Sequence, residues 1–345
     1  MSELPIWQYD SLFLILVLLF GITALAMQNL MGAAIVFGAY SFLMCLIWTT
    51  MGAVDVAFTE AAVGAGVSTV FIVSTIYNTG VSAIPKSPRI AFKILASLIA
   101  IGTGAFLLSA LPDFPHWGDP KSPVNSIVAP YYIENSMKDA HVPNIVTTVL
   151  ADYRSFDTLL ETTVVFIACI AIYSILRIDN AKLKVTEPDI ITSPPAYDPT
   201  DSLIIRQASR IMVPFMQLFA LYVISHGHYS PGGGFQGGVI LAASIILLCI
   251  SFDLKYVLQY WTEKKIMLLT ALGVLIFALV GLACTLMGGE YLNYGMLDSV
   301  LPGDKAYARS HGILLVEIGV GMTVMFSMIG IYINLASNGR FDRGL

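Results

Sequence analysis

Apolar segments of about 20 residues recur along this sequence, and this is the length of a helix that crosses a lipid bilayer. Hydrophobic residues make up 57% of the 345 positions, charged residues make up 12%, and the mean hydropathy is +0.77. A soluble domain carries roughly a quarter charged residues, so the bilayer is the expected solvent. The sequence therefore predicts an all-α polytopic protein of the cell membrane.

Nine segments are long and apolar enough to be transmembrane helices. The first three are separated only by short glycine-containing joints. Two longer connections follow, an outer loop at residues 112–157 and a proline-rich cytoplasmic linker at residues 183–204. The nine predicted helices lie at residues 11–30, 33–50, 57–77, 90–111, 158–176, 205–225, 235–252, 266–287 and 312–335.

The basic residues fall unequally on the two sides of these segments. Thirteen of the 18 Lys and Arg residues lie on one side, which the positive-inside rule makes cytoplasmic. This predicts the N-terminus outside and the C-terminus in the cytoplasm; no cleavable signal peptide is expected. The thirteen are Lys86, Arg89, Lys93, Arg177, Lys182, Lys184, Arg206, Arg210, Lys255, Lys264, Lys265, Arg340 and Arg343.

Composition and motifs exclude several classes of function. The net charge of −5 is mild and no basic stripe is present, so no nucleic-acid partner is expected. The HExxH motif of metalloproteases is absent. The four cysteines lie singly in apolar segments without CxxC spacing. We expect no metal, no cofactor and no enzymatic activity of the chain itself, and we interpret Cys45, Cys169, Cys249 and Cys284 as small core residues.

Acidic residues in or at the edge of the predicted helices are the first candidate site. An ionised side chain at the centre of a bilayer costs about 2.5–3.5 kcal/mol on insertion scales, so such residues usually face a polar interior. We interpret them as members of an ion or proton path, with structural pairing to a neighbour as the alternative. The candidates are Asp55, Glu60, Asp157, Glu161 and Glu317.

Glu60 lies beside two glycines, Gly64 and Gly66, in the third predicted helix. Glycine in a membrane helix allows close packing or a bulge that frees backbone carbonyls. An acid beside a deformable stretch is typical of a gate, and a tight helix-packing patch is the alternative. Asp157 and Glu161 are spaced i, i+4 and share one helix face, where Arg154 is placed to neutralise Asp157.

The stretch HGHYSPGGGFQGG, residues 226–238, is the second candidate site. Its proline and glycines end one helix and allow turns with positive φ. Its free backbone N–H groups suit an anion or a carboxylate, and we expect no metal there because no third ligand is evident. A water-lined half-channel and a contact with a partner subunit both fit such a loop. The residues singled out are His226, His228, Pro231, Gly232, Gly233, Gly234 and Phe235.

The second half of the chain resembles the B subunit of Mrp-type multisubunit Na+/H+ antiporters. The stretch HGHYSPGGGFQGGVILAAS is similar to the signature of that subunit, and GILLVEIGVGMTVM is similar to its last helix. In the first half, DVAFTEAAVGAGVSTVFIVSTI and NIVTTVLADYRSFDTLLETTVVF resemble the C-terminal region of the Mrp A subunit. They also resemble the D and E subunits of membrane-bound hydrogenases, a region similar to the bulged-helix membrane subunit of respiratory complex I.

This resemblance implies a fusion of modules. Residues 1–80 would form a three-helix D-like domain and residues 81–182 a two-helix E-like domain with the outer loop 112–157. Residues 183–204 would be the linker, and residues 205–345 a four-helix B-like domain. By the same resemblance, Glu60 matches the acid implicated in ion passage, Asp157 and Glu161 match an Asp-Thr-x-x-Glu pattern, and Pro231 to Phe235 match the B signature.

The implied function is that of a membrane subunit of a cation (Na+)/proton antiporter, contributing to an ion path and to assembly. The implied partners are large antiporter-like subunits, a small C-like subunit and lipid, with Na+ and H+ as the ions. The chain lacks the long antiporter-like subunits with lysine-bearing broken helices, so it is not expected to transport alone. Two alternatives stay open: the same module in a redox-driven hydrogenase complex, and a purely structural adaptor.

Overall fold

The computed structural model describes residues 6–80, 90–116, 118–177 and 202–339 of the chain. The regular elements in these residues are helices. Eight of them are long and apolar enough to cross a membrane, and the shorter apolar stretch Asp10–Ala26 adds to them. The predicted all-α polytopic membrane fold is therefore confirmed, whereas the orientation of the termini stays a prediction.

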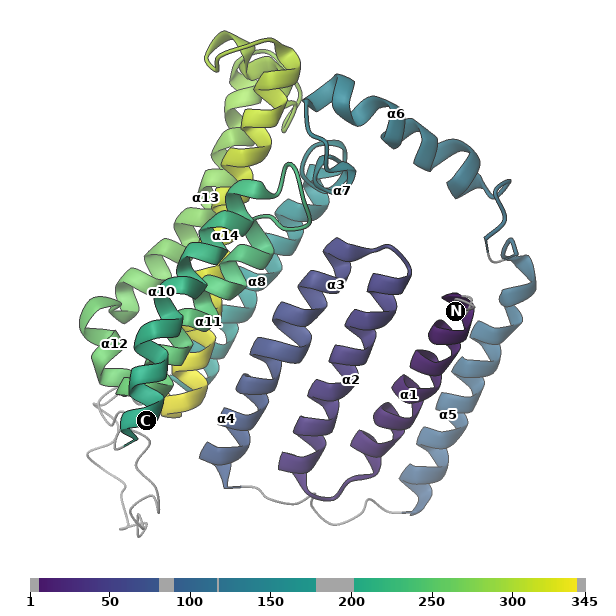
Figure 1. The fold of residues 1–345 in the computed structure, drawn as a ribbon, viewed down its shortest axis with the longest axis vertical. Helices are drawn as coiled ribbons and strands as arrows, with labels where there is room; N and C mark the ends of the chain where they lie inside the picture. Colours follow the sequence, from purple (N-terminus) through teal and green to yellow (C-terminus); the bar gives the residue numbers. More distant parts are fainter. Residues whose placement is uncertain (1–5, 81–89, 117, 178–201, 340–345) are drawn as a thin grey trace, which may run out of the picture.

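The first helices of the chain form a row of neighbours (Figure 1). Their outward faces carry exposed Leu, Ile and Phe side chains, as suits helices that meet lipid or other membrane proteins. The third predicted membrane helix is continuous but changes its winding in the middle. The row consists of α1 (Ile6–Ala26), α2 (Leu30–Thr50), and the run of α3 (Val54–Glu60), the π-helix η1 (Ala61–Ser68) and α4 (Thr69–Thr79).

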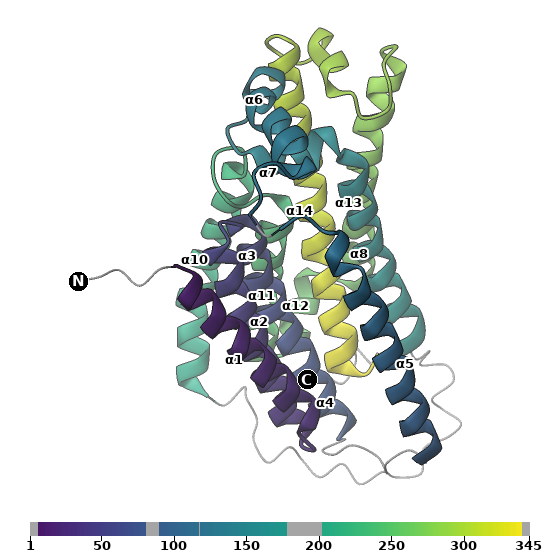
Figure 2. The same ribbon diagram turned by 90° about the vertical axis from the view of Figure 1, so that its right-hand side faces the viewer.

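The next membrane helix, α5 (Ile90–Ser109), is drawn beside α1 in Figure 1, but the turned view of Figure 2 shows it apart from the first helices. It has no buried residue. Its sequence is apolar on all sides, so lipid or another membrane protein must cover it. The structure thus places a membrane helix where the described part of the chain buries none of its residues.

The predicted outer loop at residues 112–157 is largely helical. The helix α6 (Ala129–Ala140) is too polar to be found by a search for membrane segments, and it crosses above the other helices (Figure 1). The short α7 (Ile145–Thr148) begins where Asn144 caps it by accepting a hydrogen bond from the N–H of Val146 at 3.1 Å. The π-helical turn η4 (Val149–Tyr153) then leads into the next membrane helix.

The remaining helices form a bundle around α14, the longest and most buried of them (Figure 1). Small residues let its neighbours approach closely, as is common between membrane helices. A Cβ on Gly319 would lie 2.7 Å from the backbone oxygen of Gly273, and a Cβ on Gly238 would lie 2.6 Å from that of Gly321. The bundle consists of α8 (Ser155–Leu176), α10 (Leu203–His226), α11 (Gly234–Phe252), α12 (Leu254–Tyr260), α13 (Glu263–Leu286) and α14 (Lys305–Ser337).

The row and the bundle meet along α4 and α14. At one end of this contact the Asn78 amide donates to the carbonyl oxygens of Leu335 and Ala336, at 3.0 and 2.8 Å. Residues 183–201 of the predicted linker lie outside the described residues, and so do six of the thirteen basic residues on the predicted cytoplasmic side. These six are Lys86, Arg89, Lys182, Lys184, Arg340 and Arg343.

Candidate functional site

A cavity of about 850 Å³ opens between α3, α8, α14 and the loop that joins α10 to α11. Four of the five acids that the sequence singles out lie on its wall: Asp55, Asp157, Glu161 and Glu317. The structure thus brings together acids from three separate stretches of the chain. The apolar part of the wall includes Val56, Val146, Leu150, Leu160, Val164, Val165, Phe235, Val316 and Val320.

The glycine loop forms one wall of this cavity. Gly232 and Gly233 have φ values of +153° and +128°, a conformation that residues with a side chain rarely adopt. The Gly232 N–H donates a hydrogen bond to Asp55 Oδ1 at 3.0 Å. A backbone N–H of the loop therefore holds a carboxylate that is 177 residues away in the sequence.

Glu317 lies directly behind the same two glycines. Glu317 is buried, at 8% exposure. A Cβ on Gly233 would lie 2.9 Å from Glu317 Oε1, and α11 begins so close to α14 that a Cβ on Gly234 would clash with the Glu317 backbone oxygen. The other carboxyl oxygen, Oε2, is buried and has no hydrogen-bond partner in the described part of the chain.

Asn144 and Thr147, at the start of α7, hold the loop in place, and neither was predicted from the sequence as a site residue. The Asn144 amide donates to the carbonyl oxygens of Gly227 and Ser230, both at 3.1 Å. The Thr147 hydroxyl donates to the same Gly227 oxygen at 2.8 Å. An asparagine before a Thr-rich turn is a helix-cap signal in the sequence, but its partners 80 or more residues away are not visible there.

The two histidines of the loop have different surroundings. His226 ends α10 and stacks on Tyr222, with ring centroids 4.8 Å apart. His228 is buried, and its Nε2 lies 3.0 Å from the Ser310 backbone oxygen. Burial lowers the pKa of His228, and the contact with Ser310 opposes that effect. Pro231 is exposed, and Phe235 lines the cavity.

The acids on α8 occupy the opposite wall. Asp157 forms an ion pair with Arg154, three residues earlier, at 2.6 Å between Oδ2 and Nη2. Glu161 also faces the cavity and is exposed. Because the Arg154 charge is taken up by Asp157, the other acids of the wall have no cation beside them among the cavity-lining residues.

Glu60 is the one predicted acid that does not line the cavity. It ends α3, and the π-helix Ala61–Ser68, which contains Gly64 and Gly66, begins at the next residue. Its carboxylate lies where a Cβ on Gly64 would be, and that Cβ would also lie 2.8 Å from Ser41 Oγ on α2. Glu60 therefore shares a helix with Asp55 and Thr59 of the cavity wall but points toward α2.

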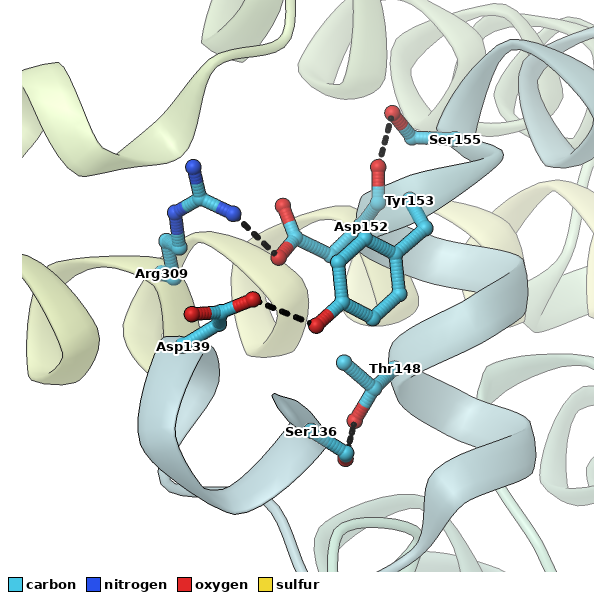
Figure 3. A network of polar contacts seen from close by, with 7 residues as sticks. All are labelled: Ser136, Asp139, Thr148, Asp152, Tyr153, Ser155 and Arg309. Atoms are coloured by element: carbon cyan, nitrogen blue, oxygen red, sulfur yellow. Dashed lines mark hydrogen bonds and ion pairs between the residues drawn. The ribbon is translucent and has the colours of Figure 1, made fainter. Parts of the chain in front are cut away.

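A polar network beside the cavity joins α6 and η4 to α14 (Figure 3). Arg309 Nη1 lies 3.0 Å from Asp152 Oδ2, and the Tyr153 hydroxyl donates to Asp139 Oδ2 at 2.6 Å. Burial raises the pKa of Asp152, and Arg309 opposes that effect. Asp152 is not among the acids predicted from the sequence, although it stands five residues before Asp157 in the same charged stretch.

No group of three or more His, Cys, Asp and Glu side chains able to hold a metal ion is found in the described ranges. What the arrangement offers instead is a set of carboxyl groups in unequal surroundings. Asp55 accepts a hydrogen bond from the backbone, Asp157 is paired with a cation, and Glu317 Oε2 is unpaired. Such a set can hold and exchange small positive charges.

Three known families match successive parts of the chain. Residues 15–81 match MbhD, the family of the D subunit of MBH, and residues 97–188 match MbhE, the family of the E subunit of MBH. Residues 204–330 match the family described as a domain related to the MnhB subunit of Na+/H+ antiporter. The three matches follow one another along the chain.

Two relatives illustrate the likeness at the level of whole proteins. The chain is 32% identical over 132 residues to the B subunit of the Na(+)/H(+) antiporter of Bacillus subtilis, a match that covers 36% of this chain and 92% of that protein. It is 24% identical over 333 residues to the A/B subunit of a probable K(+)/H(+) antiporter of Rhizobium meliloti. This second match covers 89% of this chain but only 32% of the Rhizobium protein.

Two solved structures are similar in fold. A chain of the Mrp complex from Dietzia sp. DQ12-45-1b has a TM-score of 0.68 at 27% identity, over 96% of this chain and 35% of the Dietzia chain. A chain of the membrane-bound sulfane sulfur reductase, described as an archaeal respiratory membrane complex, has a TM-score of 0.51 at 25% identity. That match covers 70% of this chain and 97% of the other.

Proposed function

The chain belongs to the family of membrane subunits of Mrp-type multisubunit Na+/H+ antiporters, and from this membership we propose that it serves a cation/proton antiporter complex as a membrane subunit. It would help to form an ion path and to assemble the complex. Its antiporter relatives are transporter components rather than enzymes. The partners would be other membrane subunits, including large antiporter-like subunits and a small C-like subunit.

We propose that the chain is a fusion of D-like (1–80), E-like (81–182) and B-like (205–345) domains, joined at the last junction by the linker 183–204. The family matches support this division because they follow in the same order. The exposed α5 supports the need for partners, since a helix without a buried residue has to be covered in the assembly.

The observation that carries the proposal is the carboxylate-lined cavity. It is built from all three proposed domains: Asp55 comes from the first, Asp157 and Glu161 from the second, and Glu317 from the third. Ionised carboxylates are costly within a membrane unless they face a polar route or a partner charge. A cavity that collects several of them, with Arg154 already paired, suits the passage of cations or protons.

Glu60 would bind or relay a cation or proton next to this cavity. It lies five residues after Asp55 on α3, and Thr59 beside it accepts a hydrogen bond from the Gln236 amide at 2.9 Å. The π-helix that follows Glu60 widens the helix locally, a feature that is frequent at functional sites. Asp157, Glu161 and Glu317 would line the adjoining polar route.

Replacing Glu60 by Gln in the intact complex tests this role. The substitution keeps the shape and removes the charge, so Na+-dependent proton transport in vesicles should fall at least tenfold while the complex still assembles. Glu60→Asp should keep part of the activity. Glu290→Gln, at an exposed position in the segment between α13 and α14, is the matched control and should transport normally. Unchanged transport by Glu60→Gln would remove the assigned role.

A second candidate function is the same module in a redox-driven membrane complex. The similarity to the sulfane sulfur reductase complex favours it. The subunits that co-purify with the chain distinguish the two: cluster-binding redox subunits would support the redox complex, and antiporter subunits alone would support the antiporter. A structural adaptor is the third candidate, and it requires full transport when Asp55, Glu60, Glu161 and Glu317 are all neutralised.

A further inference from the structure

Two acids of the cavity wall lie on either side of one tight turn, Gly232–Gly233. Asp55 Oδ1 accepts from the Gly232 N–H at 3.0 Å. Glu317 lies on the other side, with Oε1 2.9 Å from where a Cβ on Gly233 would be and Oε2 3.3 Å from where a Cβ on Gly227 would be. The absence of side chains at these glycines makes room for the Glu317 carboxyl group.

The two acids differ in what stabilises a negative charge on them. Asp55 has a backbone donor, whereas Glu317 Oε2 is buried without any hydrogen-bond partner among the described residues. The N–H groups of the turn are already used, since Gly232 donates to Asp55 and Gly233 donates to the Val223 oxygen at 3.2 Å. A buried carboxylate oxygen without a donor or a cation is strongly disfavoured, whereas a protonated carboxyl group is not.

The charged groups around Glu317 also disfavour a negative charge on its carboxyl group. Asp55 interacts with it electrostatically from α3, and Asp157 and Glu161 face the same cavity from α8. Arg154 is bound to Asp157. His228 of the loop points to the Ser310 oxygen, and His311 lies near His228. No cation in the described part of the chain is therefore placed to neutralise Glu317.

We propose that Glu317 is a proton-binding site, loaded from the cavity and held in its neutral form behind the Gly232–Gly233 turn, with Asp55 bound to the Gly232 N–H beside it. Proton release breaks the O–H bond, passes the proton to water in the cavity and leaves a carboxylate facing Asp55, a state that a cation entering the cavity would stabilise. The inference rests on the proposed function, since it needs the cavity to exchange ions.

Infrared difference spectroscopy of the intact complex in lipid, between alkaline and acidic pH, tests this site without measuring transport. The wild-type complex should show the carbonyl band of a protonated carboxyl group, and 13C-labelled glutamate should shift that band. Glu317→Gln should lose the band, and Glu290→Gln should keep it. Asp55→Asn should keep it at a shifted position, and this variant serves as well if Glu317→Gln does not assemble.

A spectrum without a glutamic acid band, or a band that survives in an assembled Glu317→Gln complex, would overturn the proposal. Weakening of the band by Na+ at constant pH would support the proposal, because a cation in the cavity would stabilise the carboxylate form. The outcome is separate from that of the proposed function. If Glu60→Gln loses transport but no Glu317 band is seen, only the proton site at Glu317 is contradicted. If the Glu317 band is seen but Glu60→Gln transports normally, only the assigned role of Glu60 in the ion path is contradicted.

Discussion

Arg309 on α14 and Asp152 on the η4 turn form an ion pair of 3.0 Å that ties the segment before α8 to the bundle. The Asp152 side chain is 4% exposed and that of Arg309 is 30% exposed, so the pair is largely shielded from water. In the proposed division of the chain, this pair joins the E-like domain to the B-like domain. It is therefore a contact between two of the proposed modules.

Arg309→Met should destabilise this contact by about 3 kcal/mol, because it leaves Asp152 buried without its cation. Burial already raises the pKa of Asp152, and removing Arg309 takes away the group that opposes this rise. The folded state then binds the Asp152 proton more tightly than the unfolded state, so stability is present at low pH and is lost as the pH rises through the raised pKa.

The measurement is the thermal unfolding of the purified complex at acidic and neutral pH. The difference between Arg309→Met and wild type should be largest at neutral pH and should shrink on acidification. The double variant Asp152→Leu/Arg309→Met, which leaves no charge behind, should recover most of the loss. A pH-independent difference, or no recovery in the double variant, would mean that the ion pair does not hold the two segments together.

Gly234→Ala should prevent normal packing of α11 against α14. The added Cβ would clash with the backbone oxygen of Glu317, and backbone cannot move aside as a side chain can. The cost should exceed the roughly 1–3 kcal/mol that is typical of an overpacked core. Gly102→Ala on α5 is the matched control, because nothing lies within 4 Å of its Cβ position.

The yield of chain that co-purifies with its partner subunits measures this effect. Gly102→Ala should match the wild type, since alanine is a better helix former than glycine, and Gly234→Ala should be strongly reduced. Equal yields from the two variants would show that α11 and α14 do not approach each other as closely as described.

Asp304→Ala should fray the first turn of α14. Asp304 caps this helix by accepting from the N–H groups of Ala306 and Tyr307, both at 3.0 Å. The hydrogen bond from Tyr307 is the main reason why the pKa of Asp304 lies below its usual value. The stabilisation is therefore present above the ordinary aspartate pKa and is lost as the pH falls through the lowered one.

Hydrogen exchange at Ala306 and Tyr307 follows this cap directly. Exchange should accelerate in Asp304→Ala at neutral pH and in the wild type only under acidic conditions. Asp304→Asn keeps a cap acceptor that does not titrate, so its protection should be independent of pH. Protection that is unchanged in Asp304→Ala would remove the cap from the account.

Local features of the sequence predict the membrane helices and the position of the glycine turn, because hydropathy and helix-breaking residues act over short distances. The contact of that turn with Asp55 and the ion pair of Arg309 with Asp152 are not local. The two partners are 177 residues apart in the first and 157 residues apart in the second, so neither pair leaves a recognisable spacing in the sequence.

Helix α6 and the polar contacts of Asn144 escape prediction for a related reason. The α6 sequence is too polar and too short for a membrane segment, and the helix lies across the others, where it contacts α14 (Figure 1). For Glu60, the sequence predicts a grouping that the structure does not show. It places Glu60 with the other membrane acids, but successive side chains of a helix face different sides. Glu60 points toward α2 rather than into the cavity.

Access of water to the cavity tests the central claim most directly, since an ion path must be reached from an aqueous phase. The measurement is the reaction of a cysteine with a charged, membrane-impermeant thiol reagent in the intact complex. Thr158→Cys, on the cavity wall, should react well above the unsubstituted background, whereas Leu98→Cys, on the exposed apolar surface of α5, should not. A Thr158→Cys complex that is assembled yet as inert as Leu98→Cys would contradict the account.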